Sequence, residues 1–348
     1  MKQRDYYFDN AKFILIFFVV FGHLLRTFIE DNEMVYTVYK VIYTFHMPAF
    51  IFVSGFFARC FNKKGYIMKI AKKLILPYLI FQIIYSIYYY FLYDKQSLAV
   101  DPLDPQWSLW FLLSLFFWNI MLIGFSRLNA ATGIMVALAL GLGIGFCGWA
   151  SNYLSLSRTF VFFPLFLLGF HLKKEHVRMF TKPSFKFVAF LSFLIVFAGF
   201  YLYPDFNYKW LLGSKPYAKL EAAALSGMLI RLGYYLLCTL MVFSFLAFVP
   251  KKQYFFTSLG KNTLYVYLLH GFIVKTFQQS SVKEYFDKPE TFLMLAGISL
   301  LLTIILSSRF ATVVAQPLIE LELSKFKIYI YRLAAIFKIY RQKILSGM

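Results

Sequence analysis

Cysteine, acidic side chains and charged residues in general are scarce in this 348-residue chain. The three cysteines, Cys60, Cys147 and Cys238, lie far apart and outside any CxxC or Cys/His pattern, which argues against a disulfide framework and a cysteine-built metal site. Charged residues make up only 15% of the chain, against roughly a quarter in soluble domains. Hydrophobic residues reach 60%, which is more than one soluble core can enclose, so we expect an integral membrane protein with several spans.

Several familiar reaction motifs are also missing. The sequence has no GxxxxGK[ST] phosphate loop, no HExxH, no GxSxG and no strand–GxGxxG–helix arrangement, so it signals neither a nucleotide-driven pump nor a zinc protease. The formal net charge is +20, but the basic residues are scattered between long apolar runs, which argues against nucleic acid as a partner. We expect no metal cofactor.

What is present is a series of apolar runs close to the roughly 20 residues that a membrane helix needs. They predict an all-α fold of about ten transmembrane helices, at 11–29, 36–58, 74–93, 107–125, 131–150, 158–172, 185–203, 227–249, 262–279 and 291–314. No small-x-small cleavage pattern follows the first run, so we expect it to stay in the mature chain as a helix.

The distribution of charge orients these spans. With the N-terminus in the cytoplasm, most of the 36 Lys and Arg residues fall on the cytoplasmic side and most of the 16 Asp and Glu residues on the other, as the positive-inside rule requires. We therefore expect both termini in the cytoplasm and one membrane domain over 1–320. In the tail, 321–348, apolar residues recur every three or four positions among Lys and Arg. This pattern predicts a basic amphipathic helix, either on the inner leaflet among membrane lipids or docked on the cytosolic face of the protein.

Ionisable side chains inside spans are costly and are functional candidates. His23, His46 and His270 lie within predicted spans. At 1.5 Å per residue, His23 and His46 reach similar depths in neighbouring spans and could face one cavity. Lys12 lies eleven residues before His23, almost three full turns, and so shares its helix face at the inner surface. An anionic ligand along that face would contact Lys12 and bring its reactive end near His23. In the alternative, Lys12 only anchors the helix end and His23 only bonds a neighbouring helix.

Further basic residues gather at the two membrane surfaces. Lys69, Lys72 and Lys73 precede the third span on the inner side, where they orient the protein and also suit a phosphorylated cytosolic ligand. Near the outer ends of spans lie other basic residues, among them Arg26, Lys40 and Arg158. They are candidates for binding an anionic acceptor or lipid headgroups.

Six segments, in order along the chain, resemble the signature stretches of acyltransferase family three, the multi-span membrane acyltransferases, and within it the fucose 4-O-acetylase-like subgroup. They are RDYYFDNAKFILIFFVVFGH, FHMPAFIFVSGFFAR, KIAKKLILPY, WSLWFLLSLFFW, RTFVFFPLFLLGF and LGKNTLYVYLLH. Lys12 stands eleven positions before His23, where many members have arginine, and Lys69 and Lys72 match a basic-x-x-basic motif in which arginines are common. Lysine keeps the charge but loses the bidentate fork of a guanidinium.

The resemblance implies transfer of an acyl group, often acetyl, from cytosolic acyl-CoA to a carbohydrate hydroxyl of the cell envelope, at a bacterial plasma membrane. It implies that His23 is catalytic, and we expect His46 to join it. We expect the donor, acetyl-CoA or another acyl-CoA, at Lys12, Lys69, Lys72 and Lys73. We expect the acceptor, a lipid-linked sugar or a polymer, at Arg26, Lys40, Arg158 and His270.

A neutral imidazole at His23 would take the proton of the acceptor hydroxyl as it attacks the thioester. Some family members append an extracytoplasmic esterase-like domain; here we expect the transfer to finish in the membrane domain or on a separate partner. Ten spans fit a transporter or flippase of an envelope precursor equally well, and a scaffold for envelope synthesis is a third hypothesis. The basic residues leading to His23 and the family motifs favour the enzyme.

Overall fold

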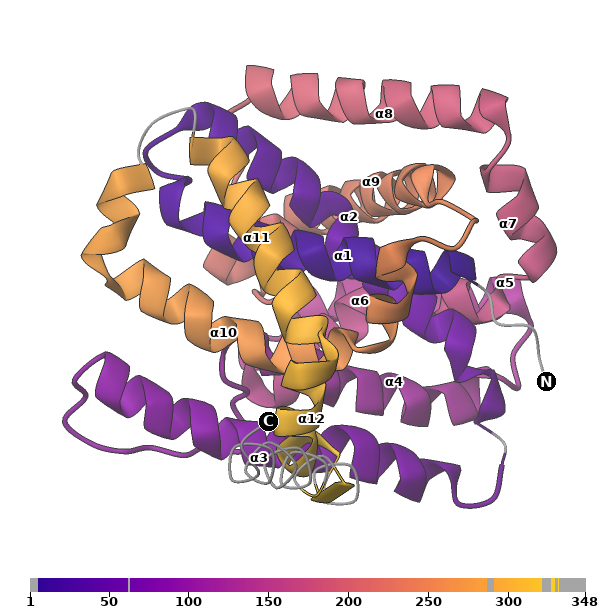
Figure 1. Ribbon diagram of the computed structural model, residues 1–348. Helices are drawn as coiled ribbons and strands as arrows, with labels where there is room; N and C mark the ends of the chain where they lie inside the picture. Colours follow the sequence, from indigo (N-terminus) through magenta and orange to yellow (C-terminus); the bar gives the residue numbers. More distant parts are fainter. Residues whose placement is uncertain (1–5, 62, 287–290, 321–326, 329–330, 332–348) are drawn as a thin grey trace, which may run out of the picture.

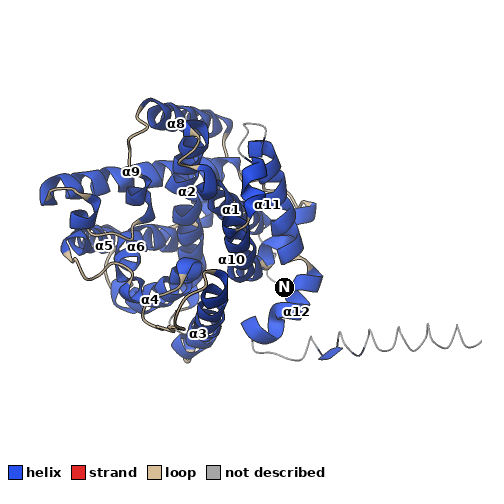
Figure 2. Cartoon of the chain, turned by 90° about the vertical axis from the view of Figure 1, so that its left-hand side faces the viewer, coloured by secondary structure: helices blue, strands red, loops and turns tan. Residues whose placement is uncertain are grey.

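The computed structural model describes residues 6–61, 63–286, 291–320, 327–328 and 331. All regular secondary structure in these residues is helical, which confirms the predicted all-α class (Figure 2). The α-helices are α1 (Tyr6–Leu25), α2 (Glu33–Phe57), α3 (Tyr66–Leu92), α4 (Trp110–Phe125), α5 (Ala130–Gly143), α6 (Leu156–His171), α7 (Lys174–Phe180), α8 (Pro183–Leu202), α9 (Ala224–Phe248), α10 (Thr263–Gln279), α11 (Thr291–Ser307) and α12 (Arg309–Ile319). The predicted amphipathic tail, 321–348, lies almost wholly outside the described residues.

Every predicted span coincides with a helix, but the helices differ in length. By length and composition, seven helical stretches of the described chain can cross a membrane, and the α11–α12 pair would make an eighth. The fifth and ninth predicted spans correspond to the shorter helices Ala130–Phe146 and α10. The protein is thus a multi-pass membrane protein, while the count of ten spans and the cytoplasmic position of both termini stay predictions.

The predicted span 291–314 is not one straight helix. It bends by 63° between α11 and α12, at Ser308. Ser308 has an extended backbone, and its hydroxyl accepts a hydrogen bond from the amide of Ala311, 3.3 Å away. A serine that caps a new helix in this way stabilises the break, because it satisfies an amide that the bend leaves without a helical partner.

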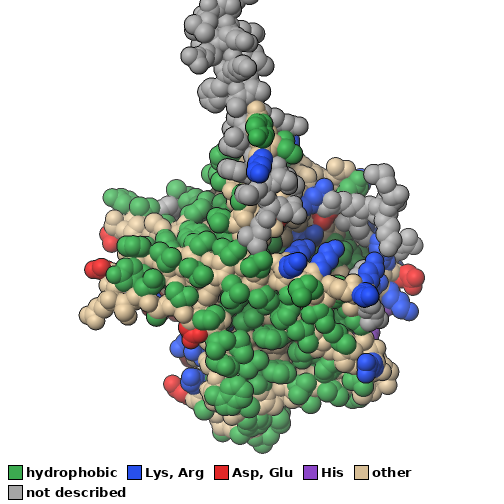
Figure 3. Space-filling view, turned by 90° about the horizontal axis from the view of Figure 1, so that it is seen from below, with side chains coloured by type: hydrophobic (Ala, Val, Ile, Leu, Met, Phe, Trp, Pro, Cys, Tyr) green, Lys and Arg blue, Asp and Glu red, His purple; other side chains and the backbone are tan. Residues whose placement is uncertain are grey.

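The α2 helix runs through the interior, and α3 and α8 lie along opposite edges of the molecule (Figures 1 and 2). In the most apolar 18-residue stretch, 72% of the α2 residues are buried, against 17% of the α8 residues. An apolar helix with so little burial has a lipid-facing surface in a membrane protein. Figure 3, which views the molecule from the opposite side, where α3 lies, shows a broad hydrophobic face there as well, with most of the visible Lys and Arg side chains toward the right.

Two glycines allow α2 and α6 to approach closely. A Cβ added at Gly55 would lie 2.9 Å from the carbonyl carbon of Phe166, and one at Gly169 would lie 2.7 Å from the carbonyl carbon of Phe52. Small residues at such crossings are typical of membrane helices, whose association depends on close packing and not on the hydrophobic effect. This contact fixes α6 against α2, the two helices that supply much of the site described next.

Candidate functional site

A cavity adjoins His23, at the C-terminal end of α1. Its wall combines polar and aromatic side chains from several helices, including His23 and Arg26, Tyr43 and His46 of α2, Trp110 of α4, Arg158 and Phe162 of α6, and Tyr267 of α10. Trp107 and Ser108, from the 3-10 helix η3 (Trp107–Leu109), close another side. Two of the three intramembrane histidines predicted from the sequence therefore share one cavity.

His23 is held between a hydroxyl and two rings. Its Nδ1 lies 3.5 Å from the hydroxyl of Tyr43, at the limit of a hydrogen bond. Its ring lies 4.5 Å from that of Trp107 and 5.5 Å from that of His270, measured between centroids. The amide of Gln278 donates to the backbone carbonyl of His23 over 3.2 Å and thereby ties α10 to this turn of α1.

The other two histidines have defined tautomers. Nδ1 of His46 lies 2.8 Å from the carbonyl of Ile42, and Nδ1 of His270 lies 2.9 Å from the carbonyl of Val266. A neutral imidazole that donates from Nδ1 keeps a lone pair on Nε2. The ring of His46 lines the cavity. On His270, which is fully buried and stacks on His23, Nε2 has no hydrogen-bond partner among the described residues.

Trp107 reaches His23 from a strained backbone. Its φ is +41°, in the left-handed region that costs a non-glycine residue about 1–2 kcal/mol. Such conformations persist where the surroundings hold them, and here the indole packs against the rings of both His23 and His270, with Nζ of Lys275 5.1 Å from its ring centroid. The room for this ring comes from Gly271, because a Cβ there would lie 2.9 Å from Cε3 of Trp107.

Arg26 and Arg158 bring positive charge to the same cavity. The Arg26 side chain is exposed and its Nη2 lies 3.4 Å from the hydroxyl of Tyr208. The half-buried Arg158 guanidinium lies 5.0 Å from the ring centroid of Trp110. Neither forms an ion pair within 4 Å with a described carboxylate; Asp104 interacts with Arg158 only at longer range. Burial and the neighbouring Asp101 raise the pKa of the Asp104 carboxyl, and Arg158 opposes that rise.

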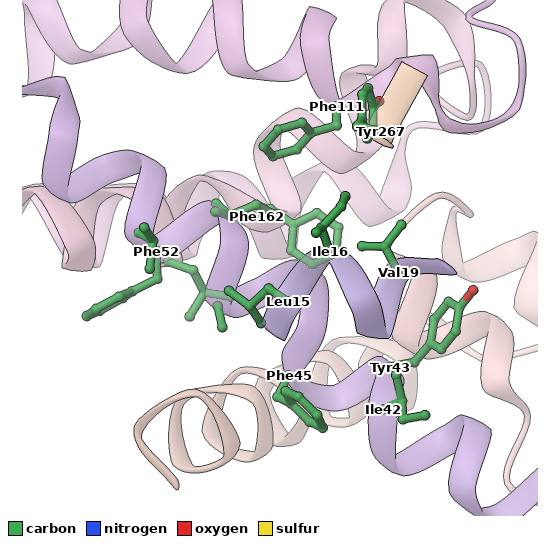
Figure 4. Packing of buried hydrophobic residues seen from close by; sticks show 14 of the residues in the cluster. Leu15, Ile16, Val19, Ile42, Tyr43, Phe45, Phe52, Phe111, Phe162 and Tyr267 are labelled. Atoms are coloured by element: carbon green, nitrogen blue, oxygen red, sulfur yellow. The ribbon is translucent and has the colours of Figure 1, made fainter. Parts of the chain in front are cut away.

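A second cavity adjoins the first. Val19, Met47 and Tyr267 line both cavities. The second is largely apolar and extends past Phe111 to the exposed Lys73 near the start of α3. Figure 4 shows the side chain of Val19 pointing from α1 toward Phe111 and Tyr267. Together the lining residues of the two cavities extend from a lysine at one surface to the histidines within the bundle.

The remaining lysines predicted to bind the donor lie outside both cavities. Lys12 pairs with Asp9, its Nζ 2.9 Å from the carboxylate, and its side chain is 24% exposed. Nearby, Asn10 donates to the carbonyls of Pro250 and Lys252 over 2.8 and 2.9 Å, which fixes the start of α1. Lys69 and Lys72 are exposed on the same helix as Lys73.

Lys40, predicted to bind the acceptor, points elsewhere. Its side chain is fully buried, and Nζ donates to the carbonyls of Phe200 and Pro204 over 3.2 and 3.1 Å. The same ammonium lies 4.1 Å from the ring centroid of Tyr36. Lys40 therefore joins α2 to the end of α8 and does not line the cavity around His23.

Sequence reasoning did not single out the aromatic part of the site, Tyr43, Trp107, Trp110 and Tyr267. In a chain with 44 Phe and 26 Tyr residues, no aromatic stands out by type. The one usable signal was spacing, because Tyr43 precedes His46 by three positions and Tyr267 precedes His270 by three, so each pair lies on one helix face. Within the described residues, no group of three or more His, Cys, Asp or Glu could hold a metal ion.

Comparison with known proteins places this site in a family. The family described as "Acyltransferase domain" matches residues 5–310. Nodulation protein NolL of Sinorhizobium fredii is 47% identical over 60 residues, 16% of each chain, and Nodulation protein NolL of Mesorhizobium japonicum is 31% identical over 157 residues, 40% of this chain and 42% of that protein. Each match thus spans less than half of the relative, and no solved structure matches. Since the family match covers nearly all of the chain, the protein belongs to acyltransferase family three, as its motifs predicted.

Proposed function

We propose that this protein is an O-acyltransferase of a bacterial plasma membrane that moves an acyl group, most simply acetyl, from cytosolic acyl-CoA to a hydroxyl of a cell-envelope carbohydrate. The observation that carries the proposal is the pair of adjacent cavities, lined by three residues in common, between Lys73 and His23. The end at Lys73 suits a phosphorylated donor, and the end at His23 suits an acceptor that carries a hydroxyl group. A thin pantetheine arm is the kind of ligand that a narrow apolar route accommodates.

The donor would enter from the cytoplasm. Lys69, Lys72 and Lys73 offer ammonium groups to the phosphates of CoA without a rigid geometry, since lysine binds phosphate as a point charge. The arm would run through the second cavity past Met47 and Tyr267, bringing the thioester to the level of His23. Lys12, paired with Asp9, would act at the membrane surface beside this route.

The chemical step needs a base beside the thioester. Nδ1–H of His23 can donate to the oxygen of Tyr43, which leaves Nε2 with the lone pair that takes the proton of the acceptor hydroxyl. The hydroxyl oxygen then attacks the thioester carbonyl, the C–S bond breaks, and the CoA sulfur takes the proton back from the imidazolium. Gaps near 3.5 Å are common in ligand-free sites and shorten when substrates bind. His46, whose lone pair on Nε2 is fixed by the carbonyl of Ile42, is placed to assist.

The test is acyl transfer by the purified full-length protein, reconstituted in lipid and given radiolabelled acetyl-CoA with an envelope extract. We expect labelled carbohydrate from the wild type and a loss of about 100- to 10,000-fold in His23→Ala, the range that a general base contributes. Size-exclusion chromatography shows that the variant is folded. Full transfer by folded His23→Ala would refute the role of this histidine. Passage of an envelope precursor across the membrane without consumption of acetyl-CoA would favour the transporter.

A further inference from the structure

The cavity around His23 holds two guanidinium groups without a partner charge. Arg26 and Arg158 both line it, and neither forms an ion pair with a carboxylate in the described part of the chain. Elsewhere in the chain, buried cations are satisfied by protein oxygens: Arg231 donates to the carbonyls of Gly141 and Lys215, and Lys40 to two carbonyls of its own. Arg26 and Arg158 differ because they line a cavity that a ligand can enter and have few protein partners: Arg26 has one contact of 3.4 Å with the hydroxyl of Tyr208, and Arg158 has no hydrogen bond within the described residues.

A neutral sugar does not require such a pair. Hydroxyl groups bind well to neutral donors and acceptors, whereas the half-buried guanidinium of Arg158 is costly unless an anion accompanies it. The planar fork of arginine matches the paired oxygens of a phosphate or a carboxylate. The contact of Arg158 with Trp110, 5.0 Å from the ring centroid, holds the group against one wall of the cavity.

The aromatic walls leave room for the rest of the acceptor. Trp107 lies against His23, Trp110 lies against the guanidinium of Arg158, and both indoles line the cavity. Flat aromatic faces pack against the apolar faces of sugar rings, and the arginines lie at the edge of the same space. A single bound saccharide can therefore contact an indole, an arginine and His23.

We propose that the acceptor is an anionic saccharide whose phosphate or carboxylate group is bound by Arg26 and Arg158 while its hydroxyl faces His23. This inference rests on the proposed acyl transfer and adds the charge of its substrate. The two arginines thus select the acceptor and set which hydroxyl reaches the base.

The experiment compares one monosaccharide in three forms, as a neutral methyl glycoside, a glycosyl phosphate and a uronate, with acetyl-CoA and the reconstituted full-length protein. We expect kcat/KM to be roughly 10- to 100-fold higher for at least one anionic form than for the neutral form, the effect of one or two charged hydrogen bonds. Which anion is preferred separates a phosphate-bearing acceptor from an acidic sugar.

Substitutions of the two arginines test whether they cause the preference for an anionic acceptor. In Arg26→Gln and Arg158→Gln we expect the ratio of anionic to neutral kcat/KM to fall toward one, and in Arg158→Lys to fall partly, since charge remains without the fork. The matched control Lys209→Gln removes an exposed charge outside the cavity and should keep the wild-type ratio. Equal use of charged and neutral acceptors by an enzyme that turns over acetyl-CoA overturns this inference alone. Absence of any acetyl-CoA turnover in the wild type overturns the proposed function and this inference with it.

Discussion

Replacing Gly271 by alanine tests whether the position of Trp107 matters for activity. The added methyl group would lie 2.9 Å from Cε3 of the indole, closer still to Cζ3, and also against the hydroxyl of Tyr85. Carbon atoms pack at about 3.5–4.0 Å, so the ring must move by about 1 Å. The substitution leaves the charge of the site and all three intramembrane histidines unchanged. Its effect on rate therefore reports the packing of Trp107 and Tyr85 beside Gly271, and a substitution of Trp107 itself separates the two.

The expected magnitude follows from that displacement. A shift of about 1 Å in a catalytic arrangement can lower a rate about 100-fold, so we expect kcat/KM for acetyl transfer to fall by that order. Overpacking of this kind costs about 1–3 kcal/mol in the free energy of unfolding. Helix propensity offsets part of that cost, because alanine is about 1 kcal/mol better than glycine in a helix interior.

This prediction is tested by the initial rates of CoA release and of acetyl transfer, measured on lipid-reconstituted protein. Gly233→Ala in α9 is the matched control, because a Cβ there meets nothing within 4 Å, and its rate should equal that of the wild type. Wild-type kcat/KM in folded Gly271→Ala would refute the reasoning. Trp107→Leu provides a second measurement, and we expect it to lose activity even if the protein accommodates the alanine.

The other predictions concern single contacts. Tyr43→Phe removes the hydroxyl 3.5 Å from Nδ1 of His23, and we expect kcat to fall about tenfold, the effect of one hydrogen bond, with KM for acetyl-CoA unchanged in steady-state assays. Lys73→Ala should weaken acetyl-CoA binding in calorimetry more than Lys12→Ala does, because Lys73 lines the cavity whereas Lys12 pairs with Asp9; the opposite order would place the donor along α1. Lys40→Met should lower the thermal unfolding temperature but leave the acceptor KM of the folded protein unchanged, because the ammonium donates hydrogen bonds only to backbone carbonyls in the described structure. A selective rise in the acceptor KM would instead show that Lys40 binds the acceptor.

The helices were predictable because lipid imposes a simple rule on the sequence. A segment that crosses the hydrocarbon core must be apolar and helical, so each long apolar run identified a helix. The start of α3 was missed by eight residues, since the helix begins at Tyr66 whereas the apolar run begins at 74. Lys69 and Lys72 are good helix formers, and their polarity hides the helix from a search for apolar runs. The break at Ser308 was missed because apolar residues continue on both sides of it.

The site was predictable in depth but not in direction. Counting residues along each span placed His23 and His46 at one level, and the structure puts both on one cavity. The same counting says nothing about rotation around the helix axis, which is why Lys40 points to the end of α8 instead. The position of Trp107 depends on a left-handed backbone conformation, which cannot be predicted from the presence of a tryptophan in the sequence. The roles assigned to these residues stay predictions until the variants are measured.

The two adjacent cavities have a consequence for membrane permeability. Exposed Arg26 lines one cavity, exposed Lys73 lines the other, and Val19, Met47 and Tyr267 line both. In a membrane that holds a proton gradient, apolar side chains between two such cavities can block ions by excluding water. We therefore expect the enzyme to block the passage of protons through the bundle. Each cycle of donor entry and CoA departure would then have to part those three side chains and close them again before protons leak through.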